Sequence, residues 1–188
     1  MARKIISITQ SSAPWSRIKG LNRRLEKAAA EALKHLPAKF RFPVTVNLLL
    51  TTDAAIRRLN RDFRGMDKAT NVLSFPQFEP HEFDKLRGAK QPVELGDIAI
   101  AYQYMVVEAE KDHKILINHV IHLFLHGLLH LFGYDHLRDP DADRMERLET
   151  KIMAALDLPD PYAPAESMEP KRKLKLAKKR SATSNPKK

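Results

Sequence analysis

Apolar residues in the first third of the chain recur with the periods of strands and helices. Residues 4–9 and 44–51 are short runs rich in isoleucine, valine and leucine, and each predicts a strand. Residues 17–36 carry apolar side chains every three or four positions, as an amphipathic helix does, and Pro37 ends the pattern. A short helix is expected over 53–60, with the aspartate at its start as the N-cap.

The middle of the chain is more polar. Residues 61–76 begin as a polar stretch and end in the apolar run 72–76, which predicts a loop leading into a short strand. Residues 77–93 are charged, contain proline and show no period, so an exposed loop is expected there. Alternation resumes over 95–102, which predicts another strand.

The last third of the folded part is helical in pattern. A helix is expected over 102–112, and residues 115–132 form a long, very apolar helix with Gly133 in the position of a C-cap glycine. Asp139 and the proline after it begin a final helix. The buried stripe of that helix is expected to consist of Met145, Leu148, Ile152 and Leu156.

The element order β-α-β-α-β-β-α-α-α predicts an α+β fold. We expect a single domain over residues 1–158, with a small mixed sheet covered by helices and the long helix over 115–132 at its centre. Residues 159–188 are first rich in proline and then basic, which predicts a disordered C-terminal tail.

The formal net charge of +10 belongs to this tail. Residues 171–188 hold nine of the 33 basic residues and no acidic residue, which leaves 24 basic and 23 acidic residues elsewhere. The tail is expected to be solvated, and its binding to a polyanion is a separate hypothesis.

The chain has no cysteine, so disulfides and thiolate metal sites are excluded. No stretch approaches the roughly 20 apolar residues that a membrane span needs, and the N-terminus lacks the apolar run of a signal peptide. The expected location is the cytoplasm, without a membrane partner.

Candidate chemistry is concentrated in the pattern H-x-x-x-H-x-x-G-x-x-H formed by His126, His130 and His136. Residues four apart share one face of a helix, so His126 and His130 can bind the same ion. Gly133 allows a sharp turn that returns His136 to it. Three imidazoles leave a fourth position open, as in catalytic zinc sites, and one zinc ion per chain is expected.

Three neighbouring side chains leave alternatives open. His122 precedes His126 by the same spacing, but only the pair His126/His130 is followed by the glycine turn. Packing or hydrogen bonding behind the metal ligands is expected for His119 and His122. Asp135 is either an orienting carboxylate or a cap of the turn.

Metzincin proteases share this histidine spacing but need a glutamate directly after the first histidine as general base. Gly127 occupies that position here. The pattern therefore favours a metal-dependent hydrolase other than a peptidase.

The run from His126 to His136, His-Gly-x-Leu-His-Leu-x-Gly-Tyr-Asp-His, resembles the signature of the YbeY family of bacterial metal-dependent endoribonucleases. Further segments similar to the family's motifs are Leu59-Asn60, Arg64-Gly65, Asp67-Lys68, residues 70–76 and residues 95–98. Met66 and Ala69 depart from the pattern, in which a polar or basic residue and a proline are expected. The resemblance covers roughly residues 3–158.

This resemblance implies a zinc-dependent, single-strand-specific endoribonuclease. It implies His126, His130 and His136 as the ligands and Arg64 as the functionally important arginine, a residue suited to a developing phosphate charge. It also implies action in the maturation of small-subunit ribosomal RNA and in ribosome quality control. The implied partners are single-stranded ribosomal RNA, the small ribosomal subunit and ribosome-associated proteins.

Two alternatives stay open from the sequence. One is a ribosome-assembly factor that acts by binding and uses its metal only to hold the fold. The other is a metal-dependent hydrolase of another substrate, including peptides.

Overall fold

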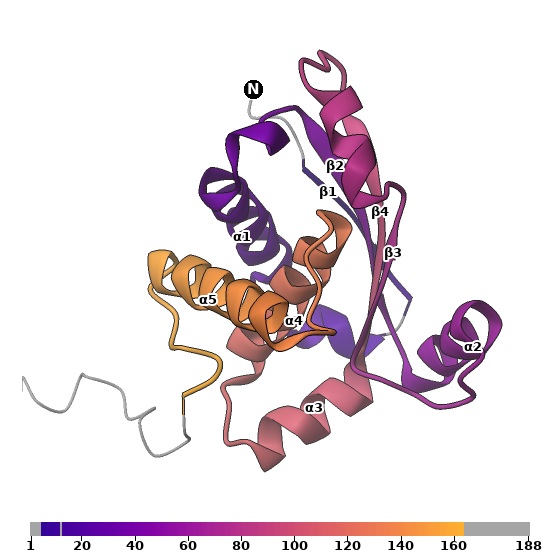
Figure 1. Cartoon of the computed structure of the whole chain (residues 1–188). Helices are drawn as coiled ribbons and strands as arrows, with labels where there is room; N and C mark the ends of the chain where they lie inside the picture. Colours follow the sequence, from indigo (N-terminus) through magenta and orange to yellow (C-terminus); the bar gives the residue numbers. More distant parts are fainter. Residues whose placement is uncertain (1–4, 12, 164–188) are drawn as a thin grey trace, which may run out of the picture.

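A mixed four-stranded sheet separates two unequal sets of helices. The computed structural model describes residues 5–11 and 13–163. In spatial order the strands are β1 (Ile6–Gln10), β2 (Val44–Thr51), β4 (Val93–Ala101) and β3 (Val72–Pro76). β1, β2 and β4 run parallel to one another, and β3 pairs antiparallel with β4 at one edge. The predicted α+β fold with a small mixed sheet is confirmed (Figure 1).

Helices cover both faces of this sheet. The α-helices are α1 (Leu21–His35), α2 (Asp53–Arg64), α3 (Tyr102–Lys111), α4 (Leu116–Leu131) and α5 (Asp139–Ala155). The short 3-10 helices are η1 (Ala13–Arg17), η2 (Ala38–Phe40) and η3 (Pro80–Leu86). Figure 1 shows α1, α4 and α5 on one face and α2 on the other. The main core fills the first side, and Ile56 of α2 packs on Leu73 and Ala99 on the second.

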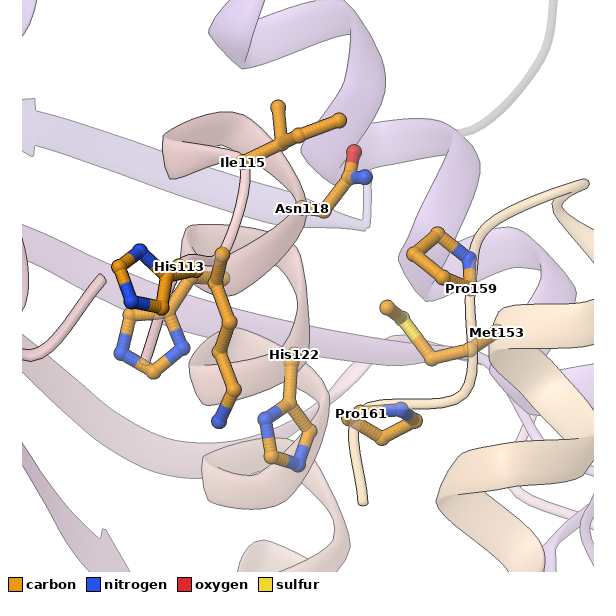
Figure 2. A pocket seen from close by; sticks show the side chains of 9 residues that line it. His113, Ile115, Asn118, His122, Met153, Pro159 and Pro161 are labelled. Atoms are coloured by element: carbon orange, nitrogen blue, oxygen red, sulfur yellow. The ribbon is translucent and has the colours of Figure 1, made fainter. Parts of the chain in front are cut away.

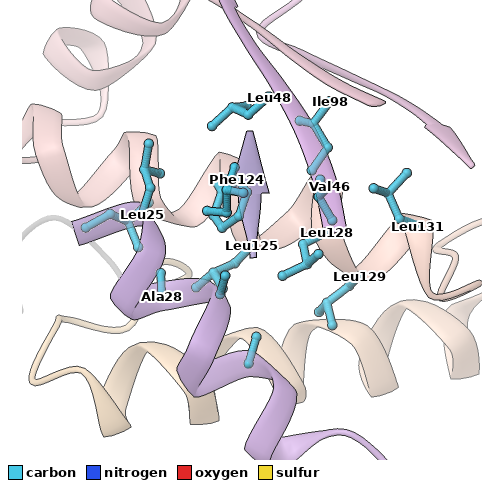
Figure 3. Packing of buried hydrophobic residues seen from close by; sticks show 14 of the residues in the cluster. Leu25, Ala28, Val46, Leu48, Ile98, Phe124, Leu125, Leu128, Leu129 and Leu131 are labelled. Atoms are coloured by element: carbon cyan, nitrogen blue, oxygen red, sulfur yellow. The ribbon is translucent and has the colours of Figure 1, made fainter. Parts of the chain in front are cut away.

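α4 is the central helix because nearly every side of it is apolar, the pattern of a helix that is buried all round. The core side chains labelled in Figure 3 are Leu25 and Ala28 of α1, Val46 and Leu48 of β2, Ile98 of β4, and Phe124, Leu125, Leu128, Leu129 and Leu131 of α4. A shift of α4 would disturb contacts with both the sheet and α1. The histidines of α4 are therefore carried on a rigid support.

The first helix begins at Leu21, four residues later than predicted. Residues 13–17 form η1 instead, and the indole of Trp15 is buried there and donates to the Thr51 carbonyl at 2.9 Å. Gly20 is the N-cap of α1 and takes a left-handed φ of 71°, a conformation that suits glycine.

The second helix is longer than predicted and has a different cap. α2 continues to Arg64, because the polar residues after Asn60 prolong the exposed face of the helix. The N-cap is Thr52, whose hydroxyl accepts from the Ala55 amide, while Asp53 accepts from the Tyr104 amide. The prediction that Asp53 is the cap was wrong by one residue.

The predicted exposed loop over 77–93 contains η3, which is only partly exposed. Phe83 of η3 is buried and lies edge-on against Phe40, with its ring 5.0 Å away, and also contacts Phe132. These aromatic contacts hold the segment, so the loop prediction was wrong for residues 80–86. The remaining predicted strands and helices occur where the pattern placed them.

Residues 159–163, which were assigned to the tail, lie against α4 and α5. The rest of the predicted disordered tail, residues 164–188, lies outside the described residues. Within the described ranges, no single helix has the length and apolar character to cross a membrane. α3 and α4 together would meet those two criteria, but they are bent by 117° at their junction.

We expect Gly96→Ala to destabilise the sheet. Gly96 of β4 has a φ of 127°, and an added Cβ would lie 2.1 Å from the carbonyl oxygen of Phe75 on β3. The clash adds to the backbone strain, so the free energy of unfolding should fall by about 3 kcal/mol or more, measured in urea.

Gly88→Ala is the matched control. Gly88 also has a positive φ, 81°, but an added Cβ there meets nothing within 4 Å. Strain alone should cost about 1–2 kcal/mol. Equal losses in the two variants would contradict the close approach of β3 and β4 at Gly96.

Candidate metal centre

Three imidazoles meet at the C-terminal end of α4. His126 and His130 lie one turn apart on this helix, and His136 belongs to the segment between α4 and α5. One ligand nitrogen from each histidine lies within 4.8 Å of the other two. The Nε2 atoms of His126 and His130 are 3.1 Å apart. The structure therefore brings together the three histidines that the sequence pattern singled out.

The turn at Gly133 brings His136 back to the helix end. Gly133 has a φ of 78°, and its amide donates to the His130 carbonyl while the Tyr134 amide donates to the Leu129 carbonyl. An added Cβ at Gly133 would lie 3.0 Å from the Pro80 ring. Positive φ and close packing both require glycine at this position.

A single metal ion fits the three nitrogens. Two nitrogens at 2.0–2.1 Å from a tetrahedral ion lie roughly 3.3 Å apart, close to the 3.1 Å between His126 and His130. Burial, followed by repulsion from His126 and His136, lowers the pKa of His130 to about 4. His130 is therefore neutral at pH 7 and free to bind a cation. An ion held by these three imidazoles would keep a fourth position for solvent or substrate.

Glu149 of α5 supports this group from behind. Its Oε1 lies 2.9 Å from His126 Nδ1, and its side chain is fully buried. The sequence analysis missed this residue. Its spacing could have indicated a buried carboxylate. Glu149 lies four residues after Met145 and three before Ile152, on the buried face of the last helix.

His119 and His122 both pair with carboxylates. His122 Nε2 lies 2.9 Å from Glu149 Oε2, and His119 Nε2 lies 3.1 Å from Glu108 Oε2. This use of His122 Nε2 favours the pair His126/His130 over His122/His126 as metal ligands. Both histidines form hydrogen bonds next to the centre, as expected.

Asp135 caps the turn. Its Oδ1 accepts a hydrogen bond of 2.7 Å from the backbone amide of His136. Of the two roles left open for Asp135, the structure supports the cap, and Glu149 takes the place of the orienting carboxylate.

A cavity of about 420 Å³ opens beside the histidines. His126 and His136 line it, together with three acidic side chains and one lysine, namely Glu108, Asp112, Glu146 and Lys114. A substrate can approach the three nitrogens from this side, but three carboxylates and one lysine give the lining no excess of positive charge for a polyanion.

Arg64, the predicted catalytic residue, lies at the end of α2 and outside the three-histidine group. Its side chain is exposed, and one guanidinium nitrogen donates to the Ser74 carbonyl of β3 at 3.1 Å. Ser74 in turn lies beside Gly127, since an added Cβ at Gly127 would be 3.1 Å from Ser74 Oγ. Arg64 is thus anchored to the strand that passes next to His126.

Gly127 packs against the sheet. A Cβ added there would lie 3.0 Å from a methyl group of Ile98 and close to Ser74. The position that carries the protease glutamate therefore has no room for a side chain of that size. The packing supports the conclusion drawn from the sequence, that the metzincin base is missing.

The lowered pKa of His130 predicts how the stability of the metal-free protein depends on pH. The pKa falls from an ordinary 6.5 in the unfolded chain to about 4 in the folded chain. The unfolded state therefore binds more protons between these values, and stability is lost as the pH falls from 6.5 towards 4. Glu149, whose pKa is lowered from 4.5 to about 2 by His122 and His126 against the effect of burial, loses its contribution only below 4.5.

The check is urea unfolding of metal-free wild type and His130→Asn at about pH 7.5 and about pH 5. The wild type should lose more stability than the variant between the two values, because only the wild type carries the His130 imidazole. An equal loss in both proteins would contradict the assigned pKa.

Comparisons with known proteins agree with this arrangement. Residues 10–157 match the family model described as "Endoribonuclease YbeY". The chain is 49% identical over 140 residues to the endoribonuclease YbeY of Bradyrhizobium diazoefficiens, an alignment covering 74% of this chain and 73% of the relative. It is 43% identical over 154 residues to that of Rhizobium meliloti, covering 79% and 87%. The alignment with the Nitrobacter hamburgensis protein covers 63% of that relative.

One solved structure shares the fold. The solution structure of TM1509 from Thermotoga maritima aligns with a TM-score of 0.53, covering 89% of this chain and 99% of that one, at 22% sequence identity. The match to the family model and the identities above 40% establish the relationship independently of the histidine geometry. The chain belongs to the YbeY family of endoribonucleases.

Proposed function

We propose that this endoribonuclease is zinc-dependent and cleaves single-stranded RNA in the maturation of small-subunit ribosomal RNA. The observation that carries the proposal is the group of His126, His130 and His136, whose nitrogens lie within 4.8 Å of one another beside an open cavity. Imidazole donors favour zinc over manganese or iron in intrinsic affinity. The family resemblance supports ribosomal RNA, the small ribosomal subunit and ribosome-associated proteins as partners, and the cytoplasm as the location.

Zinc held by three imidazoles supplies a Lewis acid and lowers the pKa of water towards about 7. The protein's own share is to hold the three nitrogens at one point and to place a cation near the phosphate. Arg64 suits the second task. It uses one nitrogen on the Ser74 carbonyl and keeps further N–H groups of a planar, permanently charged fork for a non-bridging oxygen.

RNA also needs a positively charged surface, which the lining of the cavity does not provide. Lys19, Arg23, Arg24 and Lys27 line a groove of about 610 Å³ beside α1. The apolar residues that line the same groove are Ile121, Leu156 and Leu158. We call these four cations and three apolar side chains the basic groove.

The basic groove is well placed for a strand that reaches the histidines. α5 passes both sites, with Met145 lining the cavity and Leu156 lining the groove. Leu156 is the C-cap of α5 and follows Met145 by eleven positions, which at the rise of a helix correspond to about 16 Å, a span that a short single strand can cover. The phosphates would then bind in the groove while the scissile bond lies at the histidines.

A binding factor with a structural metal remains the alternative that experiment must separate from the enzyme. Peptide hydrolysis is disfavoured, because Gly127 packs on the sheet where metzincins carry their base.

His130→Ala should remove both zinc and RNA cleavage. Removing a residue that is hydrogen-bonded to a metal ligand typically lowers metal affinity or activity by about 10–100-fold. Removing a ligand itself should therefore lower the cleavage rate by at least about 100-fold. Metal content and cleavage are measured on the same samples. The control is His81→Ala, which changes an exposed histidine of η3 outside the three-histidine group and should retain both. Cleavage that survives the loss of zinc would contradict the enzymatic proposal.

Neutralising the basic groove should weaken RNA binding. The triple variant Arg23→Gln/Arg24→Gln/Lys27→Gln removes three exposed cations from α1. For single strands the dependence of log Kd on log salt should become shallower by about 2, since each phosphate contact contributes roughly 0.7. The measurement is a salt titration in the His130→Ala background, where the RNA stays intact.

The control for this experiment is Arg41→Gln/Lys85→Gln/Arg87→Gln, which removes the same charge from exposed sites outside the groove. Binding that responds equally to both triple variants would indicate a general charge effect and rule out the groove as the RNA site.

A further inference from the structure

The buried Glu149 and the partly exposed Tyr162 form a hydrogen-bonded pair directly behind the metal centre. The Tyr162 hydroxyl donates to Glu149 Oε2, and Glu149 Oε1 lies 2.9 Å from His126 Nδ1. We propose that Glu149, itself held by Tyr162, is a positioning residue that keeps the proton of His126 on Nδ1 and so leaves Nε2 as the ligand atom. This inference rests on the proposed metal site, and it extends the functional unit beyond the region that matches the family model.

The contacts of Glu149 leave little freedom to its carboxylate. The side chain has no exposed surface, and burying a carboxylate is unfavourable unless hydrogen bonds compensate for the lost water. His126 faces Oε1, whereas His122 and Tyr162 face Oε2. Both oxygens are therefore engaged by side chains that can donate a hydrogen, as an ionised carboxylate requires.

An ionised carboxylate can only accept hydrogen bonds. The nitrogen of His126 that faces Glu149 must therefore carry a hydrogen, and in the neutral ring Nε2 then has a free lone pair. This Nε2 atom is the one that lies 3.1 Å from His130 Nε2. Glu149 thus selects the tautomer that the metal requires, without touching the metal itself.

Tyr162 is held in place by the segment that follows α5. Asp160 accepts hydrogen bonds from the Thr150 hydroxyl at 3.1 Å and from the Tyr162 amide at 3.0 Å. The Tyr162 ring lies edge-on against His122, with the ring centroids 5.4 Å apart. Burial and the nearby Glu149 raise the pKa of Tyr162, so the hydroxyl keeps its proton and remains a donor.

The same segment encloses a small cavity of about 70 Å³. Figure 2 shows Pro159 beside Met153 of α5 and Pro161 beside the ring of His122. The family match ends at residue 157, so these contacts come from the part of the chain beyond it. The order of residues 159–163 is thereby linked, through Tyr162 and Glu149, to the geometry of His126.

Glu108 provides a matched comparison. It pairs with His119 through a contact of 3.1 Å and accepts from the Asn71 amide, but it touches none of the three clustered histidines. Glu108→Gln and Glu149→Gln therefore remove the same charge from a histidine–carboxylate pair. Only the second pair includes a proposed metal ligand.

The test measures zinc affinity by competition with a chelator and the His126 tautomer by ¹⁵N NMR of the metal-free protein. The wild type should carry the proton on Nδ1. Glu149→Gln should reduce zinc affinity by about 10–100-fold and give a mixture of tautomers, whereas Glu108→Gln should stay within about twofold of the wild type. Tyr162→Phe removes a single hydroxyl near the surface and should reduce zinc affinity by about 3–10-fold. This variant tests the proposal even if Glu149→Gln fails to fold.

Equal zinc affinity in wild type, Glu149→Gln and Tyr162→Phe would overturn the proposal. An equal loss in Glu108→Gln, or a wild-type His126 with its proton on Nε2, would overturn it as well. A wild type that binds no zinc would refute the proposed metal site. The tautomer of the metal-free protein would still decide the role of Glu149 on its own.

Discussion

The close approach of His126, His130 and His136 is the constraint on which the rest of the structure depends. Two imidazole nitrogens 3.1 Å apart, with a third within 4.8 Å, cannot all carry a hydrogen directed at the same point. Repulsion between them and burial keep His130 neutral. A cation resolves this conflict, because it accepts all three lone pairs at once.

The fold holds the three histidines in place and leaves one side of them open. α4 is fixed by core contacts to the sheet and to α1, and the turn at Gly133 returns the chain to its end. The helix face towards the sheet is so closely packed at Gly127 that it leaves no room for a catalytic side chain. The opposite face opens into a cavity whose lining holds three carboxylates and one lysine, while four cations line the basic groove near α1. The proposed function thus assigns metal chemistry and RNA binding to different surfaces.

Much of the fold and of the metal centre could be predicted from patterns of neighbouring residues in the sequence. The histidine spacing, the glycine turn and the long apolar helix are encoded within about twenty consecutive residues, and all three occur as the pattern indicated. Features that depend on distant contacts were not predictable in this way. Glu149 lies 23 residues from His126 and acquires its role only when α5 packs on α4. The burial of Phe83 depends on Phe40 and Phe132. The end of α2 could not be predicted from apolar periodicity, because its last turn is polar.

The central claim is that one zinc ion at the three histidines supports RNA cleavage. The most direct measurement is a zinc titration of the metal-free protein, with cleavage of a single-stranded RNA followed at each addition. Cleavage should be negligible without metal and should rise linearly until about one zinc per chain has been added. Full cleavage by the metal-free protein, or a rise that continues well beyond one equivalent, would contradict the central claim.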